Sequence, residues 1–160
     1  MLRRKAAATV LTGHDELVSV RDGHLARPAS ASLLDLSFDE VAPGRVVLGF
    51  GPTRRFADGD TIPTGVLAGV AECAMRTAVR TTVLASTDVS VSSLSIEHPH
   101  AVLVDSSRLH CEGELVGAML ARATITDGAG RVVLRAQATC RVVPAAFDDS
   151  PRQPGAHQAA

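Results

Sequence analysis

A stretch of small and apolar residues covers positions 63–78 and reads PTGVLAGVAECAMRTA. Apolar positions recur in it at i, i+3 and i+4, which predicts a helix from Pro63 to about Val83. Proline suits the first turn of a helix, and Thr64 is expected to cap it. The predicted apolar face consists of Leu67, Val70, Ala71, Ala74 and Ala78.

Shorter segments with alternating or continuous apolar residues predict strands. Residues 45–51 form the first, with Val46, Leu48 and Phe50 on one face. Gly113 is expected to mark a turn between two later strands, and residues 127–130 a hairpin loop. The later strands are predicted at 87–97, 102–112, 115–126 and 132–143. In the last of these, one face carries Leu134, Ala136, Ala138, Cys140 and Val142.

A helix that is apolar nearly all round needs protein on every side. A curved antiparallel sheet made of successive hairpins would surround it, which predicts a single α+β domain over residues 31–144. Residues 1–30 are interpreted as an N-terminal extension, with a short helix or strand at 16–20. Residues 32–41 predict a short helix or an edge strand. Residues 145–160 have the composition of a disordered tail.

The composition of the chain argues against nucleic acids and membranes as binding partners. The chain has 160 residues, a formal net charge of −1, four Phe and no Trp or Tyr. It lacks the basic surplus that draws proteins to nucleic acid or anionic membranes, and the aromatic platforms that stack bases. The N-terminal apolar run is too short for a signal peptide or a membrane span, so we expect a cytoplasmic protein.

The three cysteines, Cys73, Cys111 and Cys140, lie far apart and form no CxxC pair. This spacing argues against a disulfide scaffold and predicts buried thiols in a reducing compartment. His98 and His100 flank a proline without further ligands nearby, so they are interpreted as histidines of a surface turn, and no metal site is expected. No GxSxG or P-loop motif is present, which excludes serine-hydrolase and nucleotide-hydrolase readings.

Glu72 is the one acid inside the predicted apolar helix. Burial of a carboxylate costs several kcal/mol unless it is paired or hydrogen-bonded. Glu72 is therefore either exposed to solvent or a group with a role in catalysis or binding. Its spacing from Arg76 and Arg80 also allows a plain solvent-exposed ion pair, worth a few tenths of a kcal/mol. The sequence leaves both interpretations open.

Three runs carry a family resemblance, at residues 41–48, 63–74 and 127–133. They resemble hotdog-fold acyl-CoA thioesterases, in particular the phenylacetyl-CoA thioesterase-like branch, which is similar to 4-hydroxybenzoyl-CoA thioesterase. The resemblance implies a curved sheet around one helix, and active sites between protomers of a homodimer or homotetramer. It also implies that Glu72 is the nucleophile or general base, and that the amides of Thr64 and Gly65 polarise the thioester. It implies no cofactor beyond the coenzyme A of the substrate.

The chain departs from the family pattern at several polar positions. The family usually has His-Gly-Gly where this chain has Pro63-Thr64-Gly65, and a hydroxyl residue at the position of Arg76. It usually has Asn or Gln near Ala57, beside Asp58, and often an Asn at the position of Ser92.

Further side chains are candidates for contacts with substrate. Arg76 is a candidate for binding an anionic acyl group, and Asp58 for orienting water, although turn chemistry explains the Asp-Gly-Asp run equally well. The neighbouring serines on the same predicted strand, Ser92 and Ser93, are candidates for substrate contact. Arg54 and Arg55 are candidates for the phosphates of coenzyme A, or are solvated loop arginines.

The residues and the resemblance suggest three candidate functions. The first is an acyl-CoA thioesterase for a small or medium acyl group. The second is a hotdog protein that binds acyl-CoA or another acyl ligand without catalysis, which the missing polar residues favour. A hotdog dehydratase or hydratase ranks last, because it needs an Asp/His pair near the helix start, where Pro63 stands.

Overall fold

The computed structural model describes residues 10–144. Three helices and a 3₁₀ turn are present in this part of the chain: α1 (Gly13–Arg21), α2 (Ala29–Leu33), η1 (Arg54–Phe56) and α3 (Thr64–Arg80). The strands are β1 (Ser37–Ala42), β2 (Arg45–Phe50), β3 (Thr87–Glu97), β4 (Leu109–Gly117), β5 (Leu120–Thr126) and β6 (Val132–Pro144).

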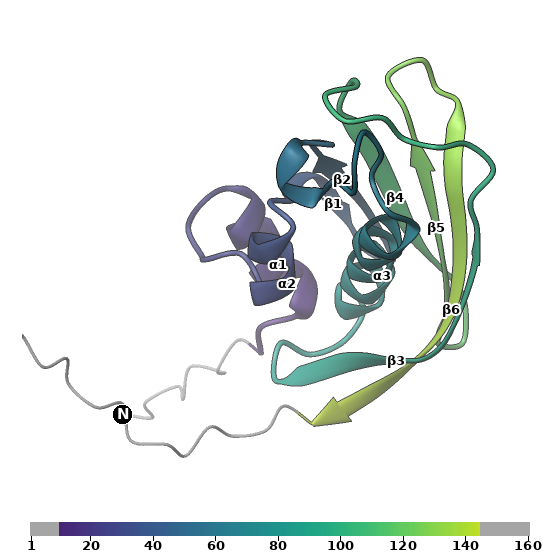
Figure 1. Cartoon of the computed structure of the whole chain (residues 1–160). Coiled ribbons are helices and arrows are strands. Elements are labelled where there is room, and N and C mark those ends of the chain that lie inside the picture. The colour runs from purple at the N-terminus through teal and green to yellow at the C-terminus, as the bar shows by residue number, and fades with distance from the viewer. Residues whose placement is uncertain (1–9, 145–160) are drawn as a thin grey trace, which may run out of the picture.

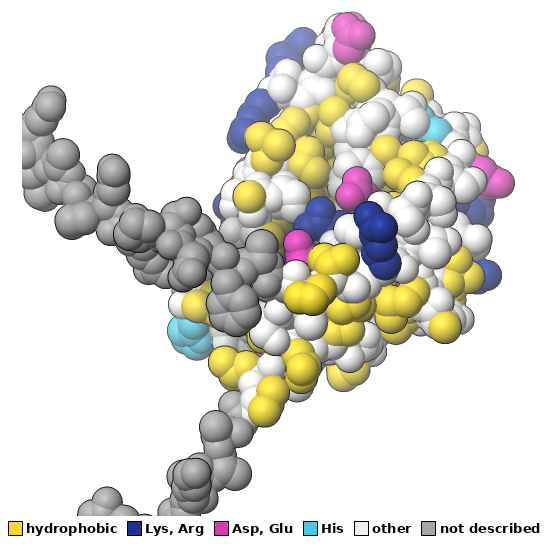
Figure 2. All heavy atoms as spheres, turned by 90° about the horizontal axis from the view of Figure 1, so that it is seen from below, with side chains coloured by type: hydrophobic (Ala, Val, Ile, Leu, Met, Phe, Trp, Pro, Cys, Tyr) yellow, Lys and Arg dark blue, Asp and Glu magenta, His cyan; other side chains and the backbone are white. Residues whose placement is uncertain are grey.

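The strands form one antiparallel sheet that curves around α3 (Figure 1), in the order β1-β2-β4-β5-β6-β3. β1 and β3 are therefore the edges of the sheet. The predicted α+β architecture, one central helix inside a curved antiparallel sheet, is confirmed. Seen from below, the surface is mostly apolar or uncharged, with a few acidic and basic side chains together near its centre (Figure 2).

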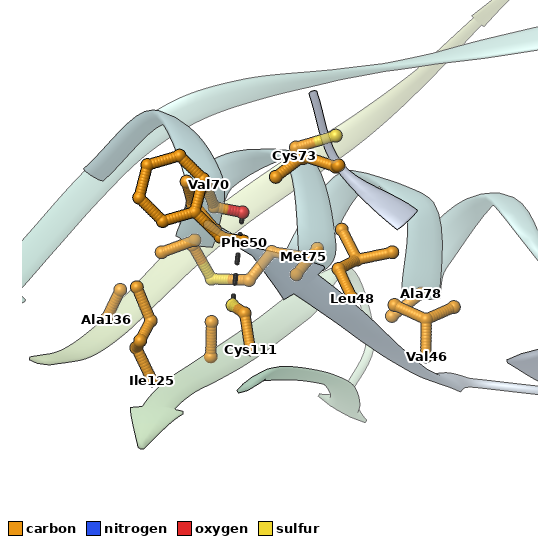
Figure 3. Close-up of a cluster of buried hydrophobic side chains, with 14 of the residues drawn as sticks. Val46, Leu48, Phe50, Val70, Cys73, Met75, Ala78, Cys111, Ile125 and Ala136 are labelled. Carbon is orange, nitrogen blue, oxygen red and sulfur yellow. Dashed lines mark hydrogen bonds between the residues drawn. The ribbon is translucent and has the colours of Figure 1, made fainter. Parts of the chain in front are cut away.

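The core lies between α3 and the concave face of the sheet. All five residues of the predicted apolar helix face are buried, and so are Val46, Leu48 and Phe50 of β2. Figure 3 shows these β2 side chains beside Met75 and Ala78 of the helix. The small size of the helix residues lets the sheet approach α3 closely, in a chain that has only four Phe and no Trp or Tyr.

The predicted helix ends earlier than expected, at Arg80 rather than near Val83. The next residue, Thr81, is 4% exposed and satisfies two backbone groups. Its hydroxyl donates to the carbonyl of Ala78 at 2.6 Å and accepts from the amide of Gly44 at 2.7 Å. This contact fixes the helix end against the β1–β2 turn.

Two strand boundaries predicted from the sequence were wrong. Gly113 lies inside β4, not in a turn, because β4 crosses α3 there at very short range. The turn follows Gly117, and Met119 in it has φ of 60°. Residues 102–108 form mostly loop rather than strand, with Leu103 in an isolated bridge to Thr61.

The alternation predicted for β6 holds along most of the strand. Leu134, Ala136, Ala138 and Cys140 are buried, but Val142 is 37% exposed. The reason is that β5 pairs with β6 only as far as Thr139, opposite Leu120, so the last residues of β6 extend beyond the neighbouring strand. The predicted hairpin loop at 127–130 joins β5 and β6, where Asp127 Oδ1 accepts from the amides of Ala129 and Arg131.

The helix α1, which precedes the sheet in the chain, packs against the same core. The weak signal at 16–20 corresponds to α1, which begins with a capping box between Thr12 and Asp15. Leu17 of α1 is buried. Glu16 accepts two hydrogen bonds from Arg80 at 3.0 Å. For residues 32–41 a short helix or an edge strand was predicted, and both occur: residues 32–33 end α2, and residues 37–41 belong to the edge strand β1. The division at residue 30 stays a prediction, and the predicted tail at 145–160 lies outside the described residues.

Candidate active site

The start of α3 presents free hydrogen-bond donors to solvent. Pro63 is the N-cap, so the expectation that Thr64 caps the helix was wrong: Thr64 is its first residue. The amides of Val66 and Leu67 donate to the Pro63 carbonyl at 3.0 and 3.3 Å. Within residues 10–144, no backbone hydrogen bond occupies the amides of Thr64 and Gly65. Free amides at the positive end of a helix can stabilise an oxyanion.

Access to these amides is open. Thr64 and Gly65 are both exposed, and a Cβ built on Gly65 would meet no heavy atom within 4 Å. A substrate carbonyl can therefore come close to the main chain at this point. The two residues that the resemblance assigns to the oxyanion site are thus both exposed.

His98 lies against the same helix start, which the sequence reading missed. Its Nδ1 is 2.8 Å from the hydroxyl of Thr64. The ring is half-buried, and its Nε2 is buried with no hydrogen-bond partner among the described residues. The surface-turn interpretation of His98 did not anticipate this contact. The two residues are 34 positions apart, so no local pattern could reveal the contact.

Glu72 lies two turns further along α3, on a half-buried strip of the helix. Its Oε1 is 3.8 Å from Nη1 of Arg76, and the two side chains are 40% and 35% exposed. An i, i+4 pair of this length and exposure stabilises a helix by only a few tenths of a kcal/mol. Arg80, on the same predicted face, binds Glu16 of α1 instead. Glu72 is thus available for other contacts.

The Glu72 carboxylate and the amides at the start of the same helix are about two turns apart. Thr64 and Glu72 are eight residues apart on α3, and a rise of 1.5 Å per residue gives about 12 Å between their backbones. Reacting atoms need to come within about 3.5 Å of each other. The two groups therefore touch only if a substrate lies between them or if a second copy of the chain supplies one of them.

The loop candidates lie in exposed positions with local partners. Asp58 exchanges backbone hydrogen bonds with Thr61 at 2.9 and 3.3 Å around a turn. Turn geometry thus accounts for the Asp-Gly-Asp run. Arg54 is 71% exposed and 3.8 Å from Asp60. Arg55 donates to the Leu33 carbonyl at 3.1 Å, and its guanidinium lies over a neighbouring phenyl ring.

The strand candidates lie on β3, which is an edge of the sheet. Ser92 is the extra residue of a bulge between Val91 and Ser93, and its hydroxyl donates to the Thr139 carbonyl at 3.1 Å. Ser92 and Ser93 are both exposed. The structure does not bring them to the helix start of the same chain.

All three thiols are free and buried, as the sequence predicted. Burial raises the pKa of the Cys73, Cys111 and Cys140 thiols above the ordinary value, so they stay protonated and are poor nucleophiles. Among residues 10–144, no three His, Cys, Asp or Glu side chains gather as a metal site would need. No helix in this part of the chain is long and apolar enough to span a membrane.

Comparisons with known proteins support the architecture. No family model matches the sequence, and no curated protein matches it. Among solved structures, E. coli PaaI, from the phenylacetic acid degradation operon, is similar with a TM-score of 0.70 and 14% identity over 83% of this chain and 96% of that one. AziG of S. sahachiroi has a TM-score of 0.67 and 21% identity, over 73% and 98%.

A hypothetical thioesterase from Streptococcus pneumoniae, solved with coenzyme A, has a TM-score of 0.65 and 20% identity, over 79% of this chain and 98% of that one. These neighbours are PaaI-like and other thioesterase-family hotdog proteins, in agreement with the resemblance drawn from the sequence. They show that this chain has the hotdog fold.

Proposed function

We propose that the protein is an acyl-CoA thioesterase. The observation that carries the proposal is the open start of α3, where the amides of Thr64 and Gly65 are unpaired among the described residues and accessible. The half-buried carboxylate of Glu72 on the same helix supplies the second group that hydrolysis needs. The similar structures named as thioesterases, one of them with coenzyme A, support this choice.

The chemistry follows from these two groups. Attack on a thioester develops negative charge on the carbonyl oxygen, which the two amides and the positive helix end stabilise. Glu72 either attacks the carbonyl carbon or takes a proton from the water that attacks it. If water attacks, the carbon–sulfur bond breaks, the thiolate of coenzyme A takes the proton that Glu72 removed from the water, and the acid is released. If Glu72 attacks, cleavage of the carbon–sulfur bond leaves an anhydride between the acyl group and Glu72. A water then hydrolyses this anhydride, which releases the acid and restores the Glu72 carboxylate, and the thiolate takes the remaining proton. No further cofactor is needed.

A second copy of the chain completes the site. As the family resemblance implies, we assign the carboxylate to one protomer and the amides to its partner; along one helix the two backbones lie about 12 Å apart. β3 is an edge strand of 11 residues, and a long exposed edge invites pairing with another strand. Pairing of β3 with its copy would form a dimer, and dimers can assemble further into a tetramer.

The remaining candidates act on the substrate in this proposal. Arg76 pairs with Glu72 or binds an anionic acyl group. Arg54, which is largely exposed, contacts the phosphates of coenzyme A, with Arg55 beside it. Ser92 and Ser93 line the edge that meets the partner, and Asp58 orients water near the helix start. If Arg76→Thr leaves the preference between neutral and acidic acyl-CoAs unchanged, the role in acyl recognition is abandoned.

Glu72→Gln tests the central claim. The variant keeps the size of the side chain but cannot act as base or nucleophile, so kcat should fall by a factor of about 100 or more. Thiol release from a panel of acyl-CoAs measures kcat, and Glu114→Gln, at an exposed acid of β4, serves as control. If the wild type hydrolyses none of the panel and Glu72→Gln folds and behaves identically, the enzyme proposal is lost.

Non-catalytic binding of acyl-CoA is the second candidate. It is favoured by Pro63 at the helix start in place of the family His, and by Arg76 beside Glu72 in place of a hydroxyl residue. Acyl-CoA would then raise the Tm without being hydrolysed. We also propose a cytoplasmic location, with which the free state of all three thiols is compatible.

A further inference from the structure

The contact between His98 and Thr64 brings an imidazole to the proposed oxyanion site from a different element. His98 directly follows β3, and its Nδ1 is 2.8 Å from Thr64 Oγ1. Proline at position 99 restricts the residue before it to extended backbone, which fixes the course of the chain at His98. The backbone of His98 is therefore restricted, and the hydrogen bond joins its ring to the first residue of α3.

Two hydrogen-bond arrangements fit this distance. Either the Thr64 hydroxyl donates to Nδ1, or Nδ1–H donates to the hydroxyl oxygen. The first leaves the proton on Nε2, which is buried and has no acceptor within residues 10–144. Among buried backbone groups, orphaned N–H donors are rarer than under-used acceptors, and the same preference favours the proton on Nδ1.

We propose that His98 is a positioning residue for thioester hydrolysis, through its Nδ1–H bond to Thr64. With the hydroxyl oxygen accepting from His98, the hydroxyl proton of Thr64 is free to donate to the substrate carbonyl oxygen. The oxyanion then has three donors: this hydroxyl and the amides of Thr64 and Gly65. The inference rests on the proposed thioesterase function and explains how the site works without a His at position 63.

His100 provides an internal comparison. It lies two residues further along the same connection and is exposed, and its Nδ1 is 2.9 Å from the carbonyl of Val132. It therefore resembles His98 in sequence environment and in having one hydrogen bond, but its partner is a strand carbonyl and not the helix start. Substitution of His100 should not affect the donors of the site.

Kinetics of matched variants test the role. Loss of one oxyanion donor lowers kcat by a factor of about 100 to 1,000, and loss of its orientation should cost less. We expect His98→Ala to lower kcat about tenfold with KM within about twofold, because the contact matters mainly in the transition state. His98→Asn retains an N–H donor near the position of Nδ1 and should stay within about threefold of the wild type. His100→Ala should leave kcat unchanged.

A double-mutant cycle separates orientation from general destabilisation. In a Thr64→Val background, His98→Ala should cause no further loss of kcat, since the hydroxyl that it orients is gone. If the two losses multiply, or if folded His98→Ala has the wild-type kcat, His98 does not act through Thr64. A merely structural role would lower the Tm without this dependence and without rescue by Asn.

The tautomer is measurable without turnover. Nitrogen-15 NMR of the wild-type protein should show the proton of His98 on Nδ1 at neutral pH. A proton on Nε2 in an active thioesterase overturns this inference and leaves the proposed function intact. A wild type that hydrolyses no acyl-CoA overturns the proposed function and with it the positioning role of His98.

Discussion

Gly113 sits where a strand and the central helix come into main-chain contact. A Cβ built on this residue would lie 2.5 Å from the carbonyl oxygen of Ala74, 2.6 Å from its carbonyl carbon and 3.0 Å from its Cβ. A Cβ atom in a protein does not come closer than about 3.0 Å to such atoms, and two of the three belong to the helix backbone. A side-chain rotation cannot relieve the overlap, so either β4 or α3 must move.

The cost follows from the packing on both sides. β4 is held by β2 and β5, and the neighbouring helix residue Met75 is fully buried, so neither element shifts without disturbing the core. Extra atoms in a packed core typically cost about 1–3 kcal/mol. Because the contact is with main chain, we expect Gly113→Ala to lie at the upper end, about 3 kcal/mol, which lowers the Tm by about 9 °C for a chain of this size.

Thermal and urea unfolding, followed by circular dichroism, measure the effect. Gly117→Ala is the matched control, because it lies in the same strand and its nearest atom, Leu120 Cβ, would be 3.7 Å away. This variant should change the free energy of unfolding by less than about 0.5 kcal/mol. If Gly113→Ala unfolds within 1 °C of the wild type, β4 and α3 do not approach each other as described.

Three other predictions concern the helix α3, the edge strand β3 and the ion pair between Arg45 and Glu112. Gly69→Ala should raise the free energy of unfolding by about 0.5–1 kcal/mol, since the helix gains propensity and the nearest atom is 3.5 Å from the new Cβ; a lower urea midpoint would contradict this. Leu94→Lys on β3 should give monomers in analytical ultracentrifugation, whereas Val116→Lys, at a matched exposure of 38% against 39%, should leave the dimer intact. The Arg45 guanidinium holds the pKa of Glu112 below its usual range, so this pair stabilises the fold above that range and stops doing so as the pH falls through the lowered value. The difference in Tm between the wild type and Arg45→Met should therefore shrink from pH 6 toward pH 3, and a constant difference would refute the assignment.

The helix and most strands were predictable because their signals are local. The i, i+3, i+4 pattern around Val70 and the alternation around Leu48 reflect burial of one face, which the sequence records directly. The curvature of the sheet followed from the apolar character of α3, since such a helix needs cover on most sides. These inferences needed no knowledge of which segments meet in space.

The predicted strand boundaries were wrong where a contact between distant segments, and not the local sequence pattern, determines the structure. Gly113 looks like a turn residue in the sequence, but it is glycine because Ala74 leaves no room for a side chain. The apolar residues 102–104 look like the start of a strand, yet Leu103 among them pairs only as a single bridge with Thr61. The sequence alone does not distinguish a turn glycine from a glycine at a close contact, or an apolar residue in a strand from one in a loop. Only the three-dimensional contacts do.

The same distinction applies to the candidate site. Glu72 could be found from the sequence because a lone acid in an apolar helix is anomalous by composition alone. His98 could not, because its partner Thr64 is 34 residues away and the histidine has no unusual neighbours. The family pattern has a His at the helix start, and this chain has Pro63 there, so the sequence suggested that the imidazole had been lost. In three dimensions an imidazole lies 2.8 Å from the next residue, delivered by the end of β3. A missing motif residue therefore argues against a chemical group at a site only once every element that reaches the site has been considered.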